Sequence, residues 1–283
     1  QGRFPRYKLP KELATTLGAR IGSGRIFVFG MDVQGKPLVA AAGNTTCGRL
    51  GLKSDCNKLT FCKLPKEITK ITTLCVGNYQ TFLLGQESSG FPVIAATGAN
   101  LRGELGLGDE INRSQFTRCR LPDSMVVVDS IELGENHIFI VGRSKNNEQL
   151  IAVAGANNYG QLGLGDYKDR NLFTLCPLPL ELEKLDGVRI INNSTYIYGK
   201  DKQNKPILFG TGDNWPHYLG IGNKKFVHCF TRCVLPKELT KINNLILERK
   251  FSFILGEDRY GHPILAACGK IKIYSLAANC QRK

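Results

Sequence analysis

The sequence lacks the features by which membrane and secreted proteins are usually recognised. No apolar run approaches the roughly 18 residues that a membrane-spanning helix needs. The chain opens at Gln1 with polar and basic residues and has no apolar core of a signal peptide. These absences exclude a transmembrane segment and predict a soluble intracellular protein, in the cytoplasm or the nucleus.

Motifs of bond-making catalysis are also absent: there is no G-x-x-x-x-G-K, no H-E-x-x-H and no G-x-S-x-G. Asp109 and Asp166 each follow a Gly-Leu-Gly, which is typical of turn-forming aspartates. The spacing of His228, Cys229 and Cys233 loosely resembles that of metal ligands. The sequence has no second cluster of Cys and His residues that could complete a zinc site. We therefore predict no catalytic residue, no metal and no cofactor. The one enzymatic activity that we leave open is guanine-nucleotide exchange.

Acidic residues are scarce relative to basic ones. The chain has 24 Asp and Glu against 38 Lys and Arg, a formal charge of +14. The basic residues are spread along the whole chain and do not form a tail. This balance predicts attraction to an acidic protein surface or to nucleic acid.

Ten cysteines could form a disulfide framework, but four of them recur once per repeat, at Cys62, Cys119, Cys176 and Cys233. Residues at the same place in different repeats cannot easily pair. We expect small buried apolar side chains in a reducing compartment.

The most informative feature is an internal repeat. The dipeptide Leu-Pro begins at residues 9, 64, 121, 178 and 235, in steps of 55 and 57 residues. Two sets of glycines keep the same steps; they are Gly30, Gly85, Gly142, Gly199 and Gly256, and Gly43, Gly98, Gly155, Gly212 and Gly269. Between these markers lie short β-branched segments such as HIFIVG, separated by turns rich in Gly, Asn and Pro. Each repeat thus supplies about four strands.

Serial four-stranded units without helices predict an all-β chain folded as a β-propeller. We predict one propeller domain over residues 1–283, with repeats at 9–63, 64–120, 121–177, 178–234, and 235–283 joined to 1–8. The last repeat stops where the N-terminal segment begins in the repeat register, and Phe4 falls at the position of Phe116. We therefore expect five four-stranded blades of about 57 residues, with the ring closed by pairing of the N- and C-terminal strands.

The segments GELGLGD (103–109) and GANNYGQLGLGD (155–166), with the Gly-x-x-His of residues 134–137, resemble the regulator-of-chromosome-condensation repeat family. The resemblance covers essentially the whole chain. It is strong in the second and third repeats and weak in the last two, where Leu276-Ala277 replaces Leu-Gly. Well-known members have seven blades, so five repeats would make a contracted propeller or part of a longer one.

The resemblance implies interaction as the function. The family includes the nucleotide exchange factor of the GTPase Ran, scaffolds, and secreted bacterial effectors that act on host GTPases in the host cytosol. In the exchange factor, contacts come partly from the Gly-x-x-His turns, which are residues 22–25, 77–80, 134–137, 191–194 and 248–251 in this chain. The partner-binding residues predicted from these turns are Arg25, Asn78, Tyr79, Gln80, Glu135, Asn136, His137, Asn193, Arg249 and Lys250. For His137 the alternative is a hydrogen bond within its own blade.

We thus expect a monomeric propeller that binds a Ran-type small GTPase or one of its regulators. Promotion of GTPase activation is less supported, because the uniform repeats leave no room for an inserted β-wedge and because Asn78, Asn193 and Arg249 stand where acidic residues are expected. The alternative is a basic propeller that binds chromatin or nucleic acid, or a general scaffold. Nucleic acid ranks second because no aromatic residues are interleaved with the basic ones in the sequence. Cys280 is four residues from the end, but polar and basic residues follow it, unlike a prenylation signal.

Overall fold

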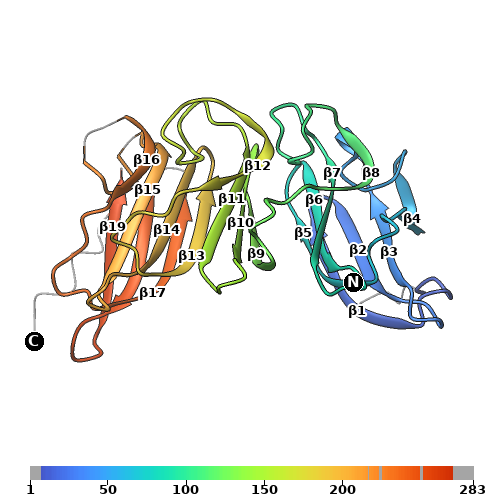
Figure 1. Cartoon of the computed structure of the whole chain (residues 1–283), viewed down its shortest axis with the longest axis horizontal. Coiled ribbons are helices and arrows are strands. Elements are labelled where there is room, and N and C mark those ends of the chain that lie inside the picture. Colours follow the sequence, from blue (N-terminus) through green and yellow to red (C-terminus); the bar gives the residue numbers. More distant parts are fainter. Residues whose placement is uncertain (1–7, 216, 223–224, 249–250, 270–283) are drawn as a thin grey trace, which may run out of the picture. The chain divides into compact units, whose positions relative to one another are not determined.

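The computed structural model describes residues 8–215, 217–222, 225–248 and 251–269. In this part of the chain nineteen strands form five antiparallel sheets (Figure 1). The one helical element described is a 3₁₀ turn, η1 (Thr46–Gly48). The predicted all-β class is confirmed. No helix in these ranges is long and apolar enough to cross a membrane.

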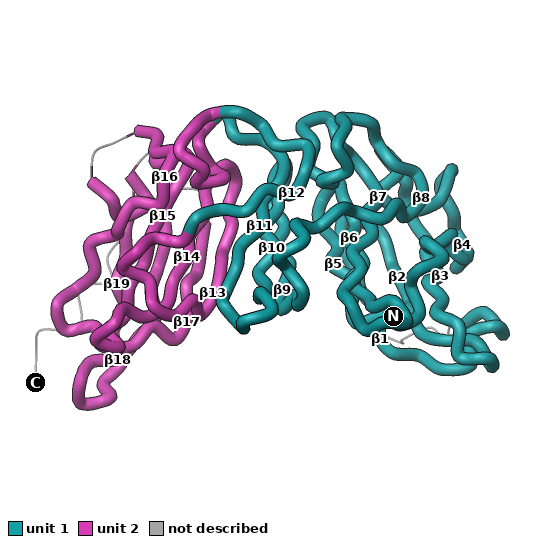
Figure 2. The backbone as a smooth tube through the Cα atoms, viewed as in Figure 1, with its two compact units in different colours: residues 1–158, 168–177 teal, residues 159–167, 178–283 magenta. Residues whose placement is uncertain are grey.

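Two compact units divide the chain (Figure 2). Unit 1 holds residues 1–158 and 168–177, and unit 2 holds residues 159–167 and 178–283. Unit 1 contains three four-stranded sheets. Their strands are β1 (Thr15–Gly22), β2 (Arg25–Met31), β3 (Pro37–Gly43) and β4 (Cys56–Phe61); β5 (Lys70–Val76), β6 (Gln80–Gln86), β7 (Pro92–Gly98) and β8 (Arg113–Arg118); and β9 (Val127–Leu133), β10 (His137–Arg143), β11 (Gln149–Gly155) and β12 (Arg170–Cys176).

Unit 2 contains one four-stranded sheet and one sheet with three described strands. They are β13 (Lys184–Ile191), β14 (Ser194–Lys200), β15 (Pro206–Asp213) and β16 (Phe226–Arg232); and β17 (Lys241–Glu248), β18 (Phe251–Glu257) and β19 (Pro263–Gly269). The predicted fourth strand of the last sheet, with Phe4 and residues 270–283, lies outside the described residues. Closure of the ring by the terminal strands, and the single domain, remain predictions.

Strand order follows the sequence in every sheet, so each sheet is an up-and-down meander with two distinct ends. At the end that we call the loop end, the first strand turns into the second, and the third leads into a glycine-rich segment. At the opposite end, which we call the connector end, lie the hairpin between the second and third strands and the Leu-Pro connector to the next sheet. Residues of the same repeat position therefore recur at the same end of successive sheets.

Burial explains why the middle strands read as continuous apolar runs. Strands such as β6 and β10 are buried along nearly their whole length, whereas most residues of the flanking β5 and β9 are half-buried or exposed. Within unit 1, apolar side chains from neighbouring sheets meet in shared cores. Phe27 and Phe29 of the first sheet, for example, pack in one cluster with Leu74, Leu83 and Phe116 of the second.

The repeated glycines of the second strand face a β-bulge. In β5, Ile71 pairs with Gly85 and Thr73 with Leu84, so Thr72 bulges out of the ladder. A Cβ placed on Gly85 would lie 2.4 Å from the carbonyl oxygen of Lys70. Each of the other four sheets has the same irregularity opposite its glycine. The period seen in the sequence thus reflects a close backbone approach that excludes any side chain.

Glycine-rich segments join neighbouring sheets. In unit 1 the segment after β3 lies on the second sheet, where Leu50 is fully buried and Gly51 packs against the ring of Phe116. The Thr97 hydroxyl contacts both the Gly48 and the Arg113 carbonyl oxygens, at 2.9 and 2.7 Å. Segment 159–167 makes the equivalent contacts in unit 2, where Leu162 is fully buried.

Candidate interaction surface

The predicted partner-binding residues fall into three groups. Exposed or half-buried at the loop ends are Asn78, Tyr79, Glu135, Asn136 and Asn193. Buried are Arg25, Gln80 and His137, each 2% exposed. Arg249 and Lys250 lie outside the described residues. Because they are buried, these three side chains cannot contact a partner at the surface.

Arg25 joins two neighbouring turns of unit 1. Its guanidinium donates to the carbonyl oxygens of Gly22 and Arg49 at 3.2 Å, to that of Asn78 at 3.3 Å, and to that of Gly77. Burial, with a smaller effect from the charge of Arg49, lowers the pKa of Arg25 to about 10. The side chain therefore stays charged at neutral pH and fixes the turn at residues 77–80.

Gln80 occupies the same repeat position in the second sheet and acts in the same way. Its Nε2 donates to the carbonyl oxygen of Glu135 in the next turn, at 2.9 Å. In these two turns the inner residue thus supports the exposed residues of the neighbouring turn. Sequence reasoning placed these residues at the correct turns but could not separate the inward-facing member from the outward-facing ones.

His137 is the third residue at this position, and burial lowers its pKa to about 3. Its ring lies 6.1 Å from that of Phe139, edge to face. Because the unfolded histidine has a pKa near 6.5, the unfolded state binds the extra proton between about pH 3 and 6.5. Stability contributed by the neutral imidazole is therefore complete above pH 6.5 and is lost as the pH falls.

We expect the free energy of unfolding to fall by about 2 kcal/mol between pH 7 and pH 5 through His137 alone. His137→Gln, which installs the residue of the second sheet, should lack this contribution. Urea unfolding of both proteins at pH 7 and pH 5 measures the difference. Equal losses in the two proteins would show that His137 is not the titrating group.

The exposed part of the loop end in unit 1 combines polar turns with large side chains. Tyr79 is 44% exposed, and the Ser23 hydroxyl donates to Asn78 Oδ1 at 3.0 Å, which links adjacent turns. Leu101 and Ile111 of the second glycine-rich segment are each 66% exposed. Exposed aromatic and aliphatic residues on a rigid scaffold are typical of a protein-binding surface.

Unit 2 carries an aromatic cluster at its loop ends that the sequence analysis missed. Trp215 is 60% exposed and its ring lies 5.8 Å from Lys225 Nζ. Tyr159 contacts Phe226, with ring centroids 5.6 Å apart. Similarly, Tyr167 lies 5.1 Å from His228. The prediction that aromatic and basic residues are not combined is therefore wrong, because Lys225 lies beside the ring of Trp215.

One signal for this cluster was available in the sequence. Trp215, the single tryptophan, stands at the repeat position of Leu101 and Asn158, directly after a third strand. A large side chain at that polar turn has no packing role in the repeat. Its exposure in the structure agrees with a role in recognition.

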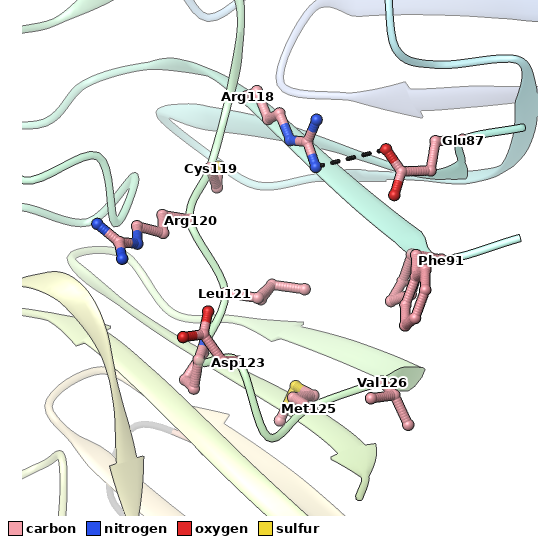
Figure 3. A pocket seen from close by; sticks show the side chains of 11 residues that line it. Glu87, Phe91, Arg118, Cys119, Arg120, Leu121, Asp123, Met125 and Val126 are labelled. Atoms are coloured by element: carbon pink, nitrogen blue, oxygen red, sulfur yellow. Dashed lines mark ion pairs between the residues drawn. The ribbon is translucent and has the colours of Figure 1, made fainter. Parts of the chain in front are cut away.

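The connector ends carry pockets. Figure 3 shows the one in the second repeat, a pocket of about 390 Å³ beside the hairpin of β6 and β7. Glu87 and Arg118 form an ion pair of 3.7 Å across it, and Arg120 and Asp123 extend from the connector. In the described chain no group of three or more His, Cys, Asp or Glu side chains is placed to bind a metal ion.

No family model matches the chain. It is 28% identical over 128 residues, 44% of its length, to the human X-linked retinitis pigmentosa GTPase regulator, and 25% identical over 221 residues, 77% of its length, to the dog protein. Human WBSCR16 superposes with a TM-score of 0.68 at 16% identity, over 94% of this chain and 66% of that one.

Yeast RCC1 (Prp20), solved in complex with Kap60, superposes with a TM-score of 0.60 at 17% identity, over 94% of this chain and 56% of that one. The chain is thus similar in sequence to the GTPase regulators and in fold to RCC1. These superpositions identify its sheets as propeller blades, as the repeat pattern predicted. The chain spans 12% and 18% of the length of the two GTPase regulators, and 56–66% of the solved chains.

Proposed function

We propose that this chain is a protein-interaction propeller whose loop ends bind a Ran-type small GTPase or one of its regulators. The observation that carries the proposal is the exposure of large aromatic residues at the loop ends, Tyr79 in unit 1 and Trp215 in unit 2. The turn of Tyr79 is held by hydrogen bonds from Arg25 to the carbonyl oxygens of Gly77 and Asn78. Three similar proteins support the class of partner. The mammalian relatives are named GTPase regulators, and the yeast protein Prp20p is described with its binding to Gsp1p and to histones.

The first test is binding of Ran to the full chain and to Trp215→Ala and Tyr79→Ala. Because exposed aromatic anchors dominate protein interfaces, each substitution should weaken binding by about 2 kcal/mol, or about thirtyfold in Kd. Isothermal titration with Ran loaded with GDP, with GTP, and without nucleotide gives the constants. Tyr260→Ala is the matched control, since Tyr260 is 68% exposed but lies at the connector end; it should leave Kd unchanged.

A pull-down from eukaryotic lysate tests the class of partner without assuming one. Recovery of a small GTPase or of its regulators supports the proposal. Recovery of chromatin proteins alone contradicts it. Release of a fluorescent guanine nucleotide from Ran would then separate exchange from binding; we rank exchange of the nucleotide below binding of the GTPase, since the regular repeats offer no inserted wedge. Cytoplasm or nucleus, or host cytosol for a secreted effector, is the compartment that such a partner requires.

Binding of nucleic acid or chromatin is the second candidate, and the aromatic cluster of unit 2 favours it. The contact of Trp215 with Lys225 combines a stacking surface with a cation. If phosphate contacts dominate, affinity for duplex or single-stranded DNA should fall steeply between about 50 and 200 mM salt. Affinity for DNA that is weak and unaffected by Trp215→Ala would exclude this candidate.

A further inference from the structure

A pocket of one design recurs at the connector ends of three repeats. In each, the Leu-Pro connector passes the hairpin between the second and third strands of the same sheet. The first pocket, of about 560 Å³, is lined by residues 34–38, 62–66, 68 and 69. The others measure about 390 Å³ in the second repeat and about 630 Å³ in the fourth. The first two lie in unit 1 and the third in unit 2.

The first pocket is strongly basic. Lys36, Lys63 and Lys66 line it, all three are exposed, and no carboxylate is among its lining residues. None of the three lysines forms an ion pair with another described residue. The nearby Asp32 is engaged by its own hairpin, because its Oδ1 accepts the backbone N–H groups of Gln34 and Lys36 at 2.9 and 2.8 Å.

Beneath the lysines the floor is apolar. Pro37 and Ile68 are buried, and Leu38 and Leu64 are half-buried and still line the pocket. No aromatic ring lines it. A ligand that filled this pocket would meet apolar side chains with its centre and three cations with its edges.

The charge is not a requirement of the fold. In the second repeat the equivalent pocket carries Glu87 and Asp123 beside Arg118 and Arg120, and the ion pair between Glu87 and Arg118 lies within it (Figure 3). The pocket of the fourth repeat is basic again. It is lined by Lys205, Arg232 and Lys237 without a carboxylate, and the partner of Arg232, Glu181, lies outside the lining.

We propose that the first pocket binds an acidic linear segment of a partner protein, with one apolar side chain on Leu38, Leu64 and Ile68 and with carboxylates on Lys36, Lys63 and Lys66. The apolar floor favours a peptide over nucleic acid, because a phosphodiester backbone has no apolar group to bury and the pocket has no ring on which a base could stack. Charge complementarity with the three unpaired lysines selects acidic sequences. This site lies at the opposite end of the sheets from the loop-end surface.

The test uses the full chain and a fluorescent synthetic peptide of alternating Glu and Asp with one central Leu. Fluorescence polarisation should give saturable binding that is lost when Leu is replaced by Ser or when the acids are replaced by Gln. The double variant Lys63→Glu/Lys66→Glu should raise Kd by about tenfold or more. These side chains are exposed, so the variant should fold, which circular dichroism checks; Lys63→Gln/Lys66→Gln gives the same direction with a smaller change.

The matched control is Lys53→Glu/Lys145→Glu, which changes the net charge equally at two exposed lysines outside the pocket. It should change Kd by less than about twofold. Equal weakening by both double variants would overturn the proposal, since net charge alone would then explain binding. An oligo-dT or a phosphatidylserine vesicle that binds more tightly than the peptide, and loses binding in the pocket variant, would also overturn it. Because Ran binding is assigned to the loop ends, the pocket variant should leave it unchanged.

Discussion

Arg25→Met should lower the free energy of unfolding by about 3–5 kcal/mol. The substitution removes the donor shared by the carbonyl oxygens of Gly22, Arg49, Gly77 and Asn78. The Arg49 and Asn78 oxygens keep a second donor, from Thr81 Oγ1 and Arg49 Nη1. The lowered pKa of Arg25 shows that burial disfavours its charge. Its hydrogen bonds to backbone oxygens must therefore compensate the lost hydration. Urea unfolding at pH 7 measures the loss.

Arg20→Met is the control for this prediction. Arg20 lies in the neighbouring strand β1, is exposed, and donates from Nη2 to Thr73 Oγ1 at 2.9 Å. Its guanidinium lies 5.7 Å from the centroid of the Phe29 ring. Its loss should cost less than about 1 kcal/mol. If Arg25→Met were no more destabilising than Arg20→Met, the buried guanidinium would have no part in holding the turns together.

Gly98→Ala should lower the free energy of unfolding by about 3 kcal/mol or more. Gly98 has a φ of +121°, and a Cβ there would lie 2.2 Å from the carbonyl oxygen of Tyr79 and 2.8 Å from the Gln80 Cα. Both contacts are with backbone of the turn at residues 77–80, which cannot move without breaking its hydrogen bonds. Displacement of that turn should also weaken partner binding at Tyr79.

Gly90→Ala separates the steric cost of an added Cβ from the cost of the backbone conformation. Gly90 lies in the hairpin of the same sheet with a φ of +87°, but a Cβ there meets nothing within 4 Å. Its cost should be that of the left-handed conformation alone, about 1–2 kcal/mol. Thermal and urea unfolding of the two alanine variants compare them directly. Equal destabilisation would mean that the approach of Gly98 to the Tyr79 carbonyl has no energetic consequence.

Much of the fold followed from the sequence because the repeat is strict. The Leu-Pro dipeptide marks a turn. In it the backbone N–H of the third residue after the proline donates to the proline carbonyl oxygen, as Ile68 does to Pro65 at 3.3 Å. The repeated cysteines are free and, at Cys62 and its three equivalents, buried. The turn-forming role predicted for Asp109 is confirmed as well, since its carboxylate accepts the N–H of Ile111 at 2.9 Å. The same role of Asp166 remains a prediction.

The candidate interaction surface could be predicted from the sequence only in part. A turn such as 77–80 can be located from spacing, but spacing does not tell which of its residues points inward. Gln80 was grouped with Asn78 and Tyr79, and the structure separates them because Gln80 begins a buried strand and reaches the next turn. The aromatic cluster around Phe226 was missed because its members come from different repeats.

The sequence by itself determined the all-β class, the period, the number of strands per repeat and the positions of the turns. These depend on local patterns: alternation of apolar residues, glycines where no side chain fits, and prolines that end strands. Tertiary structure alone decided which polar residues are buried, as at Arg25 and His137, and which residues share a surface or a pocket, as Lys36 and Lys63 do. The reason is that these properties arise between segments far apart in the chain, where folding and not spacing sets the distance.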